Sequence, residues 1–253
     1  MQQFNIFQAI YMSFYSKKLY RDVALNWGGK AFLYLLLIIA LVSVYFAIAV
    51  QGLANVAYKQ ASANIFPQIP EISIKDGKLS TPEKRPYFIT DTNKKIFAVI
   101  DTTGQYKTLA QANAPLLVTE TQIITEPKPN EMRIYTIPAK MEQKIVPQQI
   151  DFFLQKFIKF LWIAFFFTIL IGFYLYRVIQ ALLYAIIGKI FSLIFSVKIG
   201  YGQILQIAMV ALTPAIILST LEYAFTFHVM YELLLYFILT LIYLFYGIMA
   251  NKN

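Results

Sequence analysis

The sequence "DTTG" at residues 101–104 contains the residue types that come closest to a catalytic motif. It is one residue longer than the Asp-Thr-Gly loop of aspartic proteases, in which two carboxylates in glycine-containing loops share a proton. A second loop of that kind is missing, because "DTN" at residues 91–93 lacks the glycine. We therefore interpret Asp101 as a turn residue that accepts hydrogen bonds from the backbone ahead of it, and Gly104 as a residue with positive φ.

Other catalytic and metal-binding arrangements lack the residues they need. The chain contains no cysteine and a single histidine, His228, which excludes disulfides and Cys/His metal clusters. Ser80 and Lys84 could form a serine–lysine pair, but serines and lysines are common on surfaces, and we interpret both as surface residues. No glycine-rich phosphate loop occurs in the sequence. We expect no catalytic residue, no cofactor, no metal and no enzymatic activity.

Glu222, His228 and Glu232 flank a short connection between two apolar runs. If these runs form a helical hairpin, the three side chains converge into a cluster that responds to protons or cations. The alternative is that they are solvated residues of a helix–helix turn. Pro214 lies within the first of the two runs, where it should kink the helix.

The elements that carry these residues are mostly apolar, since 58% of the chain is hydrophobic and only 14% is charged. Runs without charge cover residues 31–58, 160–176, 199–221 and 233–251, each near the roughly 20 residues that cross a bilayer as a helix. We predict a membrane protein with an α-helical transmembrane block of four spans, at residues 31–50 and about 157–177, 202–222 and 231–250. A cleaved signal peptide is the alternative for the first run, but the long aromatic segment before it favours a retained anchor.

Residues 178–198 continue the second apolar run without a proline. Small and polar residues recur every four positions and share one helix face suited to close packing: Gln180, Tyr184, Gly188, Ser192 and Ser196. We interpret this segment as an interfacial helix on the cytoplasmic side. The alternative is a fifth span with Lys189 near its middle, where a charge is costly.

Residues 1–30 form an N-terminal cytoplasmic segment in which Phe7, Ile10, Tyr11 and Phe14 recur at helical spacing. This pattern predicts an amphipathic helix. It lies either in the lipid headgroup region or against the protein's own helices.

Residues 51–150 contain nine of the ten prolines and several short runs rich in β-branched and aromatic residues, "EISI", "IFAVI", "PLLVTE" and "MRIYTI". Turn signals separate them at Asp76-Gly77, Thr103-Gly104 and residues 127–130. This composition favours a small β-rich domain, inserted after the first span, over a disordered linker. The C-terminal membrane block then occupies residues 151–253.

The distribution of charge predicts the orientation of the chain in the membrane. One set of short segments has Asp22 as its only acidic residue and many basic ones: Lys17, Lys18, Arg21, Lys30, Arg177, Lys189, Lys198 and Lys252. We place these segments and both termini in the cytoplasm, next to the anionic inner leaflet of the bilayer, and residues 51–150 outside. Contact with anionic lipid accounts for the net charge of +9 without nucleic-acid binding.

Four stretches resemble domain-of-unknown-function family 1189 in order and spacing: "SFYSKKLYRDVALNWGGKAFLYLLL" at 13–37, "IKDGKLSTPEKRPYFI" at 74–89, "VIDTTG" at 99–104 and "ALTPAI" at 211–216. The resemblance covers nearly the whole chain. It implies a bacterial multi-span inner-membrane protein with an extracytoplasmic insertion after the first span. It implies no catalytic residue, only motif positions with a structural role: Tyr20, Arg21, Asp22, Asp76, Gly77, Asp101 and Gly104.

Two classes of function fit these observations. The first is a non-enzymatic envelope protein whose extracytoplasmic domain binds a ligand or another membrane or envelope protein. The alternative is an accessory component of a small-solute transport system, in which the polar third and fourth spans line a path. A sugar is one such solute, since some members of the family that the chain resembles are labelled as maltodextrin-utilisation proteins. The chain lacks the internal repeat that many secondary transporters show, which argues against a complete transporter.

Overall fold

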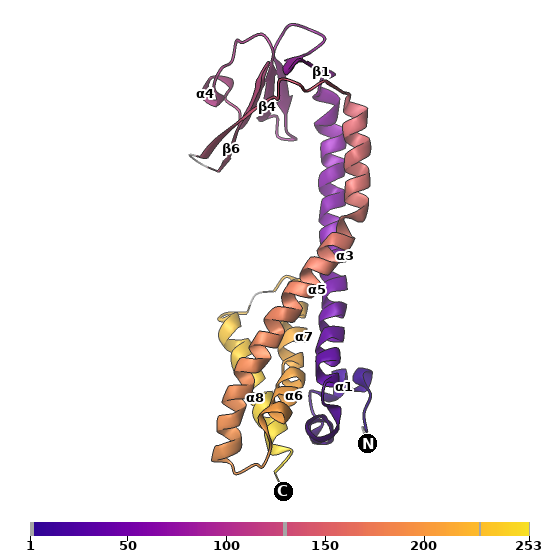
Figure 1. The fold of residues 1–253 in the computed structure, drawn as a ribbon, viewed down its shortest axis with the longest axis vertical. Helices are drawn as coiled ribbons and strands as arrows, with labels where there is room; N and C mark the ends of the chain where they lie inside the picture. The colour runs from indigo at the N-terminus through magenta and orange to yellow at the C-terminus, as the bar shows by residue number, and fades with distance from the viewer. Residues whose placement is uncertain (1–2, 129–130, 228, 253) are drawn as a thin grey trace. The chain divides into compact units, whose positions relative to one another are not determined.

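The computed structural model describes residues 3–128, 131–227 and 229–252. The chain folds into two units (Figure 1). The helical unit contains the residues up to Ile48 and from Ile163 onward, and the β unit contains Ala49–Trp162.

Four helical stretches in the described part of the chain are long and apolar enough to cross a membrane: Lys30–Gln68, Pro147–Ile194, Tyr201–Phe225 and Glu232–Met249. They contain the helices α3 (Lys30–Asn64), α5 (Pro147–Ile194), α6 (Tyr201–Ala211), α7 (Thr213–Phe225) and α8 (Glu232–Met249), and the 3₁₀ turn η2 (Phe66–Gln68). Four apolar helices and a small β region are compatible with the predicted membrane protein that carries a β domain.

Two helices extend beyond the predicted boundaries. α3 continues to Asn64, past the expected end of the first span at residue 50, because its polar second half contacts the start of α5. There Asp151 accepts hydrogen bonds from the hydroxyls of Tyr58 (2.7 Å) and Ser62 (3.2 Å). α5 passes residue 177 without a break, so the predicted division into a span and a separate helix at 178–198 is absent. No proline interrupts the sequence there.

The N-terminal segment folds as α1 (Ile6–Met12), α2 (Lys17–Asp22) and the π-helix η1 (Val23–Trp27). Asn5 caps α1 through a hydrogen bond from the Gln8 N–H, and Ser16 caps α2. Ala9 is fully buried, whereas Phe7 and Tyr11 remain exposed. Ile10 of the predicted stripe packs against the core of the helical unit, so the segment contacts that unit through Ala9 and Ile10 while Phe7 and Tyr11 stay outside the contact.

Close helix packing in the helical unit depends on small residues, as the stripe on α5 predicts. Tyr184, Gly188 and Ser192 are buried, while Ser196 lies beyond the end of α5 and is exposed. A Cβ atom at Gly188 would lie 2.5 Å from Ile204 on α6, and one at Gly247 on α8 would lie 2.6 Å from the ring of Tyr20. These glycines allow α5, α6, α8 and the N-terminal segment to share one apolar core.

The β unit contains two sheets. β1 (Ile72–Lys75), β2 (Lys78–Ser80) and β8 (Gln143–Ile145) form an antiparallel sheet in the order β2-β1-β8. The second sheet has the order β3-β4-β5-β6-β7, built from β3 (Tyr87–Thr90), β4 (Ile96–Asp101), β5 (Leu116–Thr119), β6 (Gln122–Lys128) and β7 (Glu131–Thr136). The four β-prone runs of the sequence lie on β1, β4, β5 and β7, so the predicted strands are confirmed.

Within the larger sheet, β4 and β5 are parallel and the other neighbours are antiparallel. The short helix α4 (Leu109–Ala112) lies in the connection between the two parallel strands. Apolar residues of β1 and β2 pack with those of β3 and β4 in one core, and α4 packs with Val99, Leu117 and Ile124 in another.

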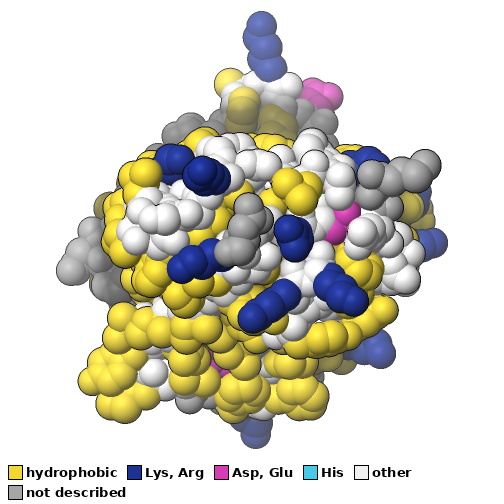
Figure 2. Space-filling view, turned by 90° about the horizontal axis from the view of Figure 1, so that it is seen from below, with side chains coloured by type: hydrophobic (Ala, Val, Ile, Leu, Met, Phe, Trp, Pro, Cys, Tyr) yellow, Lys and Arg dark blue, Asp and Glu magenta, His cyan; other side chains and the backbone are white. Residues whose placement is uncertain are grey.

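Basic side chains are exposed on the end of the helical unit that carries α2, the α5–α6 connection and the C-terminal segment. Figure 2 shows this end face-on, with lysine and arginine side chains spread among hydrophobic ones. The exposed cations of these segments are Lys17, Lys18, Arg21, Lys198 and Lys252. We refer to this surface as the basic face.

Candidate ligand-binding cavity

Asp101 ends β4 and holds the turn that follows it. Its carboxylate accepts hydrogen bonds from the Thr103 backbone N–H (2.8 Å), the Thr103 hydroxyl (2.6 Å) and the Tyr106 backbone N–H (2.6 Å). Gly104 adopts a φ of 80°. Burial alone would raise the pKa of Asp101, but these hydrogen bonds outweigh it and hold the pKa below its usual value. The contacts are those of a turn and not of a paired catalytic carboxylate.

Replacing Asp101 by asparagine should destabilise the β unit by about 1–3 kcal/mol, because the amide NH₂ would face the N–H of Tyr106 or the donors of Thr103. This cost exceeds what the sequence pattern alone suggests, since asparagine is itself a good turn residue. Hydrogen exchange of the β4 amides in the wild type and the variant measures the difference. A variant with unchanged protection would contradict the assigned contacts.

The same carboxylate makes the stability of the β unit depend on pH. A lowered folded-state pKa stabilises the fold above the unfolded-state pKa of about 3.9, and this contribution is lost as the pH falls through the folded-state value. The difference in stability between wild type and Asp101→Asn should therefore be constant from about pH 5 to 8 and shrink below about pH 4. A difference that grows on acidification would rule out an ionised Asp101.

Asp76 and Gly77 form the two-residue turn between β1 and β2, with φ values of 50° and 72°. This is the geometry of a tight hairpin in which both central residues have positive φ. The Gly77 backbone also lies against residues 138 and 139, so that a Cβ atom there would be 2.7 Å from the Cα of Ala139. Asp76 and Gly77 thus have the structural role expected of them.

Asp22 is a hydrogen-bond centre for the N-terminal segment, and 3% of its surface is exposed. Its carboxylate accepts bonds from the backbone N–H groups of Gln3 (3.0 Å) and Phe4 (3.2 Å) and from the side chains of Asn26 (2.8 Å) and Trp27 (3.0 Å). Burial would raise the pKa of Asp22, but the hydrogen bonds outweigh it and the pKa is lowered. The fully buried Tyr20 donates its hydroxyl to the Ser13 carbonyl (2.7 Å), whereas Arg21 is exposed.

Pro214 and the acidic residues of the third and fourth apolar helices lie in different surroundings. Pro214 is in the first turn of α7, where α6 ends and α7 begins. Glu222 is buried and accepts hydrogen bonds from the Val229 backbone N–H (2.6 Å) and the Tyr236 hydroxyl. Glu222 and Glu232 line one pocket of about 300 Å³ with Tyr223, Thr226 and Phe227. His228, the third member of the predicted cluster, lies outside the described residues.

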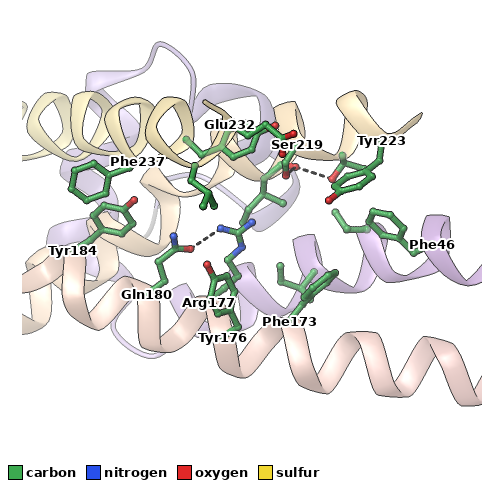
Figure 3. A pocket seen from close by; sticks show the side chains of 16 residues that line it. Phe46, Phe173, Tyr176, Arg177, Gln180, Tyr184, Ser219, Tyr223, Glu232 and Phe237 are labelled. Atoms are coloured by element: carbon green, nitrogen blue, oxygen red, sulfur yellow. Dashed lines mark hydrogen bonds between the residues drawn. The ribbon is translucent and has the colours of Figure 1, made fainter. Parts of the chain in front are cut away.

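A larger cavity of about 330 Å³ lies among α3, α5, α7 and α8 within the helical unit. We call it the arginine cavity, because Arg177 projects into it from α5 while Glu232 lies on the opposite wall (Figure 3). The Arg177 Nη1 donates a hydrogen bond to Gln180 Oε1 (2.6 Å), which uses one N–H of a guanidinium group that carries several. Ser219 and Thr220 add hydroxyl groups to the wall, although each donates its proton to the carbonyl of Ile216.

Neither Arg177 nor Glu232, the two charges of the arginine cavity, forms an ion pair with a residue that the structure describes. The four ion pairs Lys78–Glu120, Arg85–Glu83, Arg133–Glu131 and Lys144–Glu71 lie in the β unit. The remaining wall is largely aromatic: Phe46, Phe173, Tyr176, Tyr184, Tyr223 and Tyr236. A cavity with apolar aromatic walls and a few convergent polar groups is the usual form of a small-molecule site.

An apolar groove of about 240 Å³ continues from this cavity along α5. The two share Tyr176, Gln180, Tyr184 and Phe237, and the groove adds Ile179, Leu183 and Ile187. Since these three residues are four positions apart, they form one line along the helix, directed away from Arg177 and toward Ile194.

The sequence alone singled out Glu232 as a candidate site residue, and it named Gln180 and Tyr184 only as members of a packing stripe. It assigned Arg177 to the cytoplasmic side as a topology signal, because the charge-free run ends there. Two local signals were present: Arg177 interrupts a run that stays apolar on both sides, and Gln180 follows at the i+3 position of the same helix. The contributions of α7 and α8 depend on tertiary packing and have no such signal.

No cluster of three His, Cys, Asp or Glu side chains that could hold a metal occurs in residues 3–128, 131–227 and 229–252. The lining of the cavity includes one cation, one anion, an amide and aromatic rings.

Fold and cavity together define a class: a chain with four candidate membrane-crossing helices, a β unit inserted between the first and second of them, and a charged cavity among the helices. The chain belongs to the family described as Protein of unknown function (DUF1189), whose family model matches residues 7–248. The match covers nearly the whole chain, which confirms the resemblance seen in the sequence. A search of curated proteins and a search of solved structures each found no match.

Proposed function

We propose that the protein is a non-catalytic integral protein of the bacterial inner membrane that binds a small molecule with an acidic group in the arginine cavity. The observation that carries this proposal is Arg177, a partly buried cation in an aromatic cavity of an apolar helical unit, with no carboxylate partner among the described residues. An arginine in such a place is costly unless an anion or water compensates it, and for this reason ionisable residues in membrane helices usually mark binding sites or pathways.

The proposed orientation places the basic face and both termini in the cytoplasm and the β unit outside. The exposed Lys17, Lys18 and Arg21 support it, because cations collect on the cytoplasmic side and contact anionic lipid there. α6 begins and α8 ends next to the basic face, so the start of α8 lies at the opposite end of the helical unit. Glu232 at the start of α8 lines the arginine cavity, and in the proposed orientation the cavity therefore lies toward the outer leaflet. Reporter fusions test this orientation. A reporter fused after Asn253 should be active only in the cytoplasm, and one inserted near Gly77 should be active only outside.

Arg177→Gln should abolish ligand binding while leaving the protein folded. The dissociation constant for the ligand should rise at least about tenfold, which is the equivalent of losing one charge-assisted hydrogen bond. Native mass spectrometry of the purified protein, released from detergent, measures the fraction of molecules that carry an adduct. Lys189→Gln is the matched control, since it removes a cation from the same helix, and the Nζ of Lys189 donates a hydrogen bond to the carbonyl of Ile199 and does not line the cavity. Absence of an adduct on the wild type, or equal adducts on both variants, contradicts the proposal.

The β unit supplies a second candidate function, the binding of a protein partner outside the membrane. The observation that favours it is β7, an edge strand whose Met132, Ile134 and Tyr135 are all more than half exposed. An exposed apolar edge strand offers unpaired backbone groups to an added strand. Photo-crosslinking from Ile134 in native membranes, compared with crosslinking from Lys94 in the β3–β4 turn, should give a discrete partner band at Ile134 alone.

The arginine cavity also bears on the alternative of an accessory transport component. α7 and α8, which belong to the third and fourth candidate spans, supply Ser219, Thr220 and Glu232 to its wall, as a solute path through these helices requires. Cross-linked co-purification separates the two functions. A transporter recovered in fixed stoichiometry favours the accessory role, and envelope-assembly or regulatory proteins favour the partner-binding role of the β unit.

A further inference from the structure

We infer that the arginine cavity and its apolar groove bind one aminophospholipid, with the phosphate at Arg177, the amine at Glu232 and an acyl chain along α5. The inference rests on the proposed function, because it specifies the ligand of the same cavity. Three features of the helical unit lead to it: the pairing of opposite charges, the continuity of cavity and groove, and the direction of the groove.

The charges select a ligand that carries both signs. Arg177 and Glu232 line the same cavity and form no ion pair with each other in the described structure. A purely anionic ligand would compensate Arg177 but would be repelled by Glu232. A purely cationic ligand would compensate Glu232 but would be repelled by Arg177. A zwitterion whose charges lie a few atoms apart compensates both.

The other acidic residue nearby does not compete for the amine. Glu222 already accepts hydrogen bonds from the Val229 N–H and the Tyr236 hydroxyl, so its carboxylate is committed to the α7–α8 connection. Glu232 has no hydrogen bond from another side chain within the described residues. Tyr223 and Tyr236 line the same cavity, and an aromatic ring attracts a cation that lies over its face.

The groove selects an amphiphile over a water-soluble zwitterion. It begins at Tyr176 and Gln180, within one helical turn of Arg177, and continues along Leu183 and Ile187. The groove gives an acyl chain van der Waals contacts along its length, whereas a free headgroup gains nothing from it. The site thus has a charged end for a headgroup and an apolar end for a chain.

The direction of the groove agrees with a lipid of the outer leaflet. Ile179, Leu183 and Ile187 lie progressively closer to the end of α5, which is on the side of the basic face. With the basic face in the cytoplasm, the headgroup lies toward the outer surface and the chain points into the bilayer, as in a lipid of that leaflet.

Thermal unfolding of the full-length protein in detergent, titrated with defined lipids, tests the inference. Phosphatidylethanolamine should raise the unfolding midpoint at a concentration about tenfold lower than phosphatidylglycerol, which has a phosphate but no amine. Glycerophosphoethanolamine, which has the headgroup but no chains, should give no shift. An equal effect of phosphatidylglycerol would overturn the zwitterion, and an equal effect of glycerophosphoethanolamine would overturn the lipid.

Two pairs of variants locate the effect. Glu232→Gln should remove the preference for phosphatidylethanolamine over phosphatidylglycerol, while Glu142→Gln, the same change at an exposed position of the β unit, should leave it. Leu183→Asn should weaken binding of both lipids, and Leu182→Asn, one residue outside the groove, should not. If the shift by phosphatidylglycerol requires Arg177 but no variant of Glu232 matters, the proposed function stands and the inference fails. If no lipid gives a shift that depends on Arg177, the inference fails, and the proposed function is then decided by the adducts on the wild type and on Arg177→Gln alone.

Discussion

Gly77→Ala should lower the free energy of unfolding of the β unit by about 3 kcal/mol or more. This is the sum of the cost of placing an alanine in the left-handed backbone conformation and the cost of an overpacked contact. The backbone of residue 77 has a φ of 72°, which an L side chain rarely adopts. In addition, the new Cβ would lie 2.7 Å from the Cα of Ala139 and 2.9 Å from the carbonyl oxygen of Pro138. Both are backbone atoms, so the strain cannot be relieved by a change of rotamer.

Gly104→Ala is the matched control, because Gly104 also has a positive φ, of 80°, but no atom outside its own chain neighbours lies within 4 Å of the position that a Cβ would occupy. It should cost only the conformational strain, about 1–2 kcal/mol. Hydrogen exchange of the β1, β2 and β8 amides measures the first variant, and that of β4 and β5 the second. Equal losses in the two variants would show that the contact with residues 138 and 139 is looser than the structure has it.

The second large effect is expected at Asp22. Asp22→Asn keeps the shape of the side chain but removes its charge and turns one acceptor into a donor that faces the N–H groups of Phe4 and Trp27. Hydrogen bonds to a buried carboxylate are among the stronger ones, so the helical unit should lose about 3 kcal/mol of stability. The indole of Trp27 should become more exposed, because its N–H loses its acceptor.

Fluorescence of Trp27 reports this change directly when Trp162, the other tryptophan, is replaced by phenylalanine. A red shift of the emission and a lower unfolding midpoint are the expected results. Arg21→Gln alters the neighbouring exposed residue and should change stability by less than about 0.5 kcal/mol. An Asp22→Asn protein with native emission and native stability would show that the N-terminal segment does not depend on this carboxylate.

Local chemistry made part of the fold predictable. The Asp76-Gly77 turn follows from the φ values that only a few residue types accept, and the strands β4 and β5 follow from their β-branched runs. The parallel pairing of β4 with β5 could not be derived in the same way, because it depends on where α4 and the connection around it fold back. The full length of α3 was missed for a similar reason, since Asp151, which contacts its second half, is far away in the sequence.

The candidate site shows the same division between local and tertiary information. Arg177 and Gln180 are neighbours on one helix and could have been paired from their spacing. Glu232 was singled out, but as a partner of Glu222, because the sequence gives no reason to bring the start of α8 opposite the middle of α5. Only the packing of α3, α7 and α8 around Arg177 assembles the cavity.

The pairing of β1 with β8 has a consequence for biosynthesis. β1 is the central strand of its sheet and pairs with β8, with Ile72 opposite Ile145. The sheet is therefore complete only when the first and last strands of the β unit have paired. The ribosome must therefore complete residue 145 before β1 acquires its second neighbour, and until then one edge of β1 remains open to wrong partners. Chains that stall before β8 should accordingly be the ones that chaperones and proteases remove first, even though their first apolar helix is already complete.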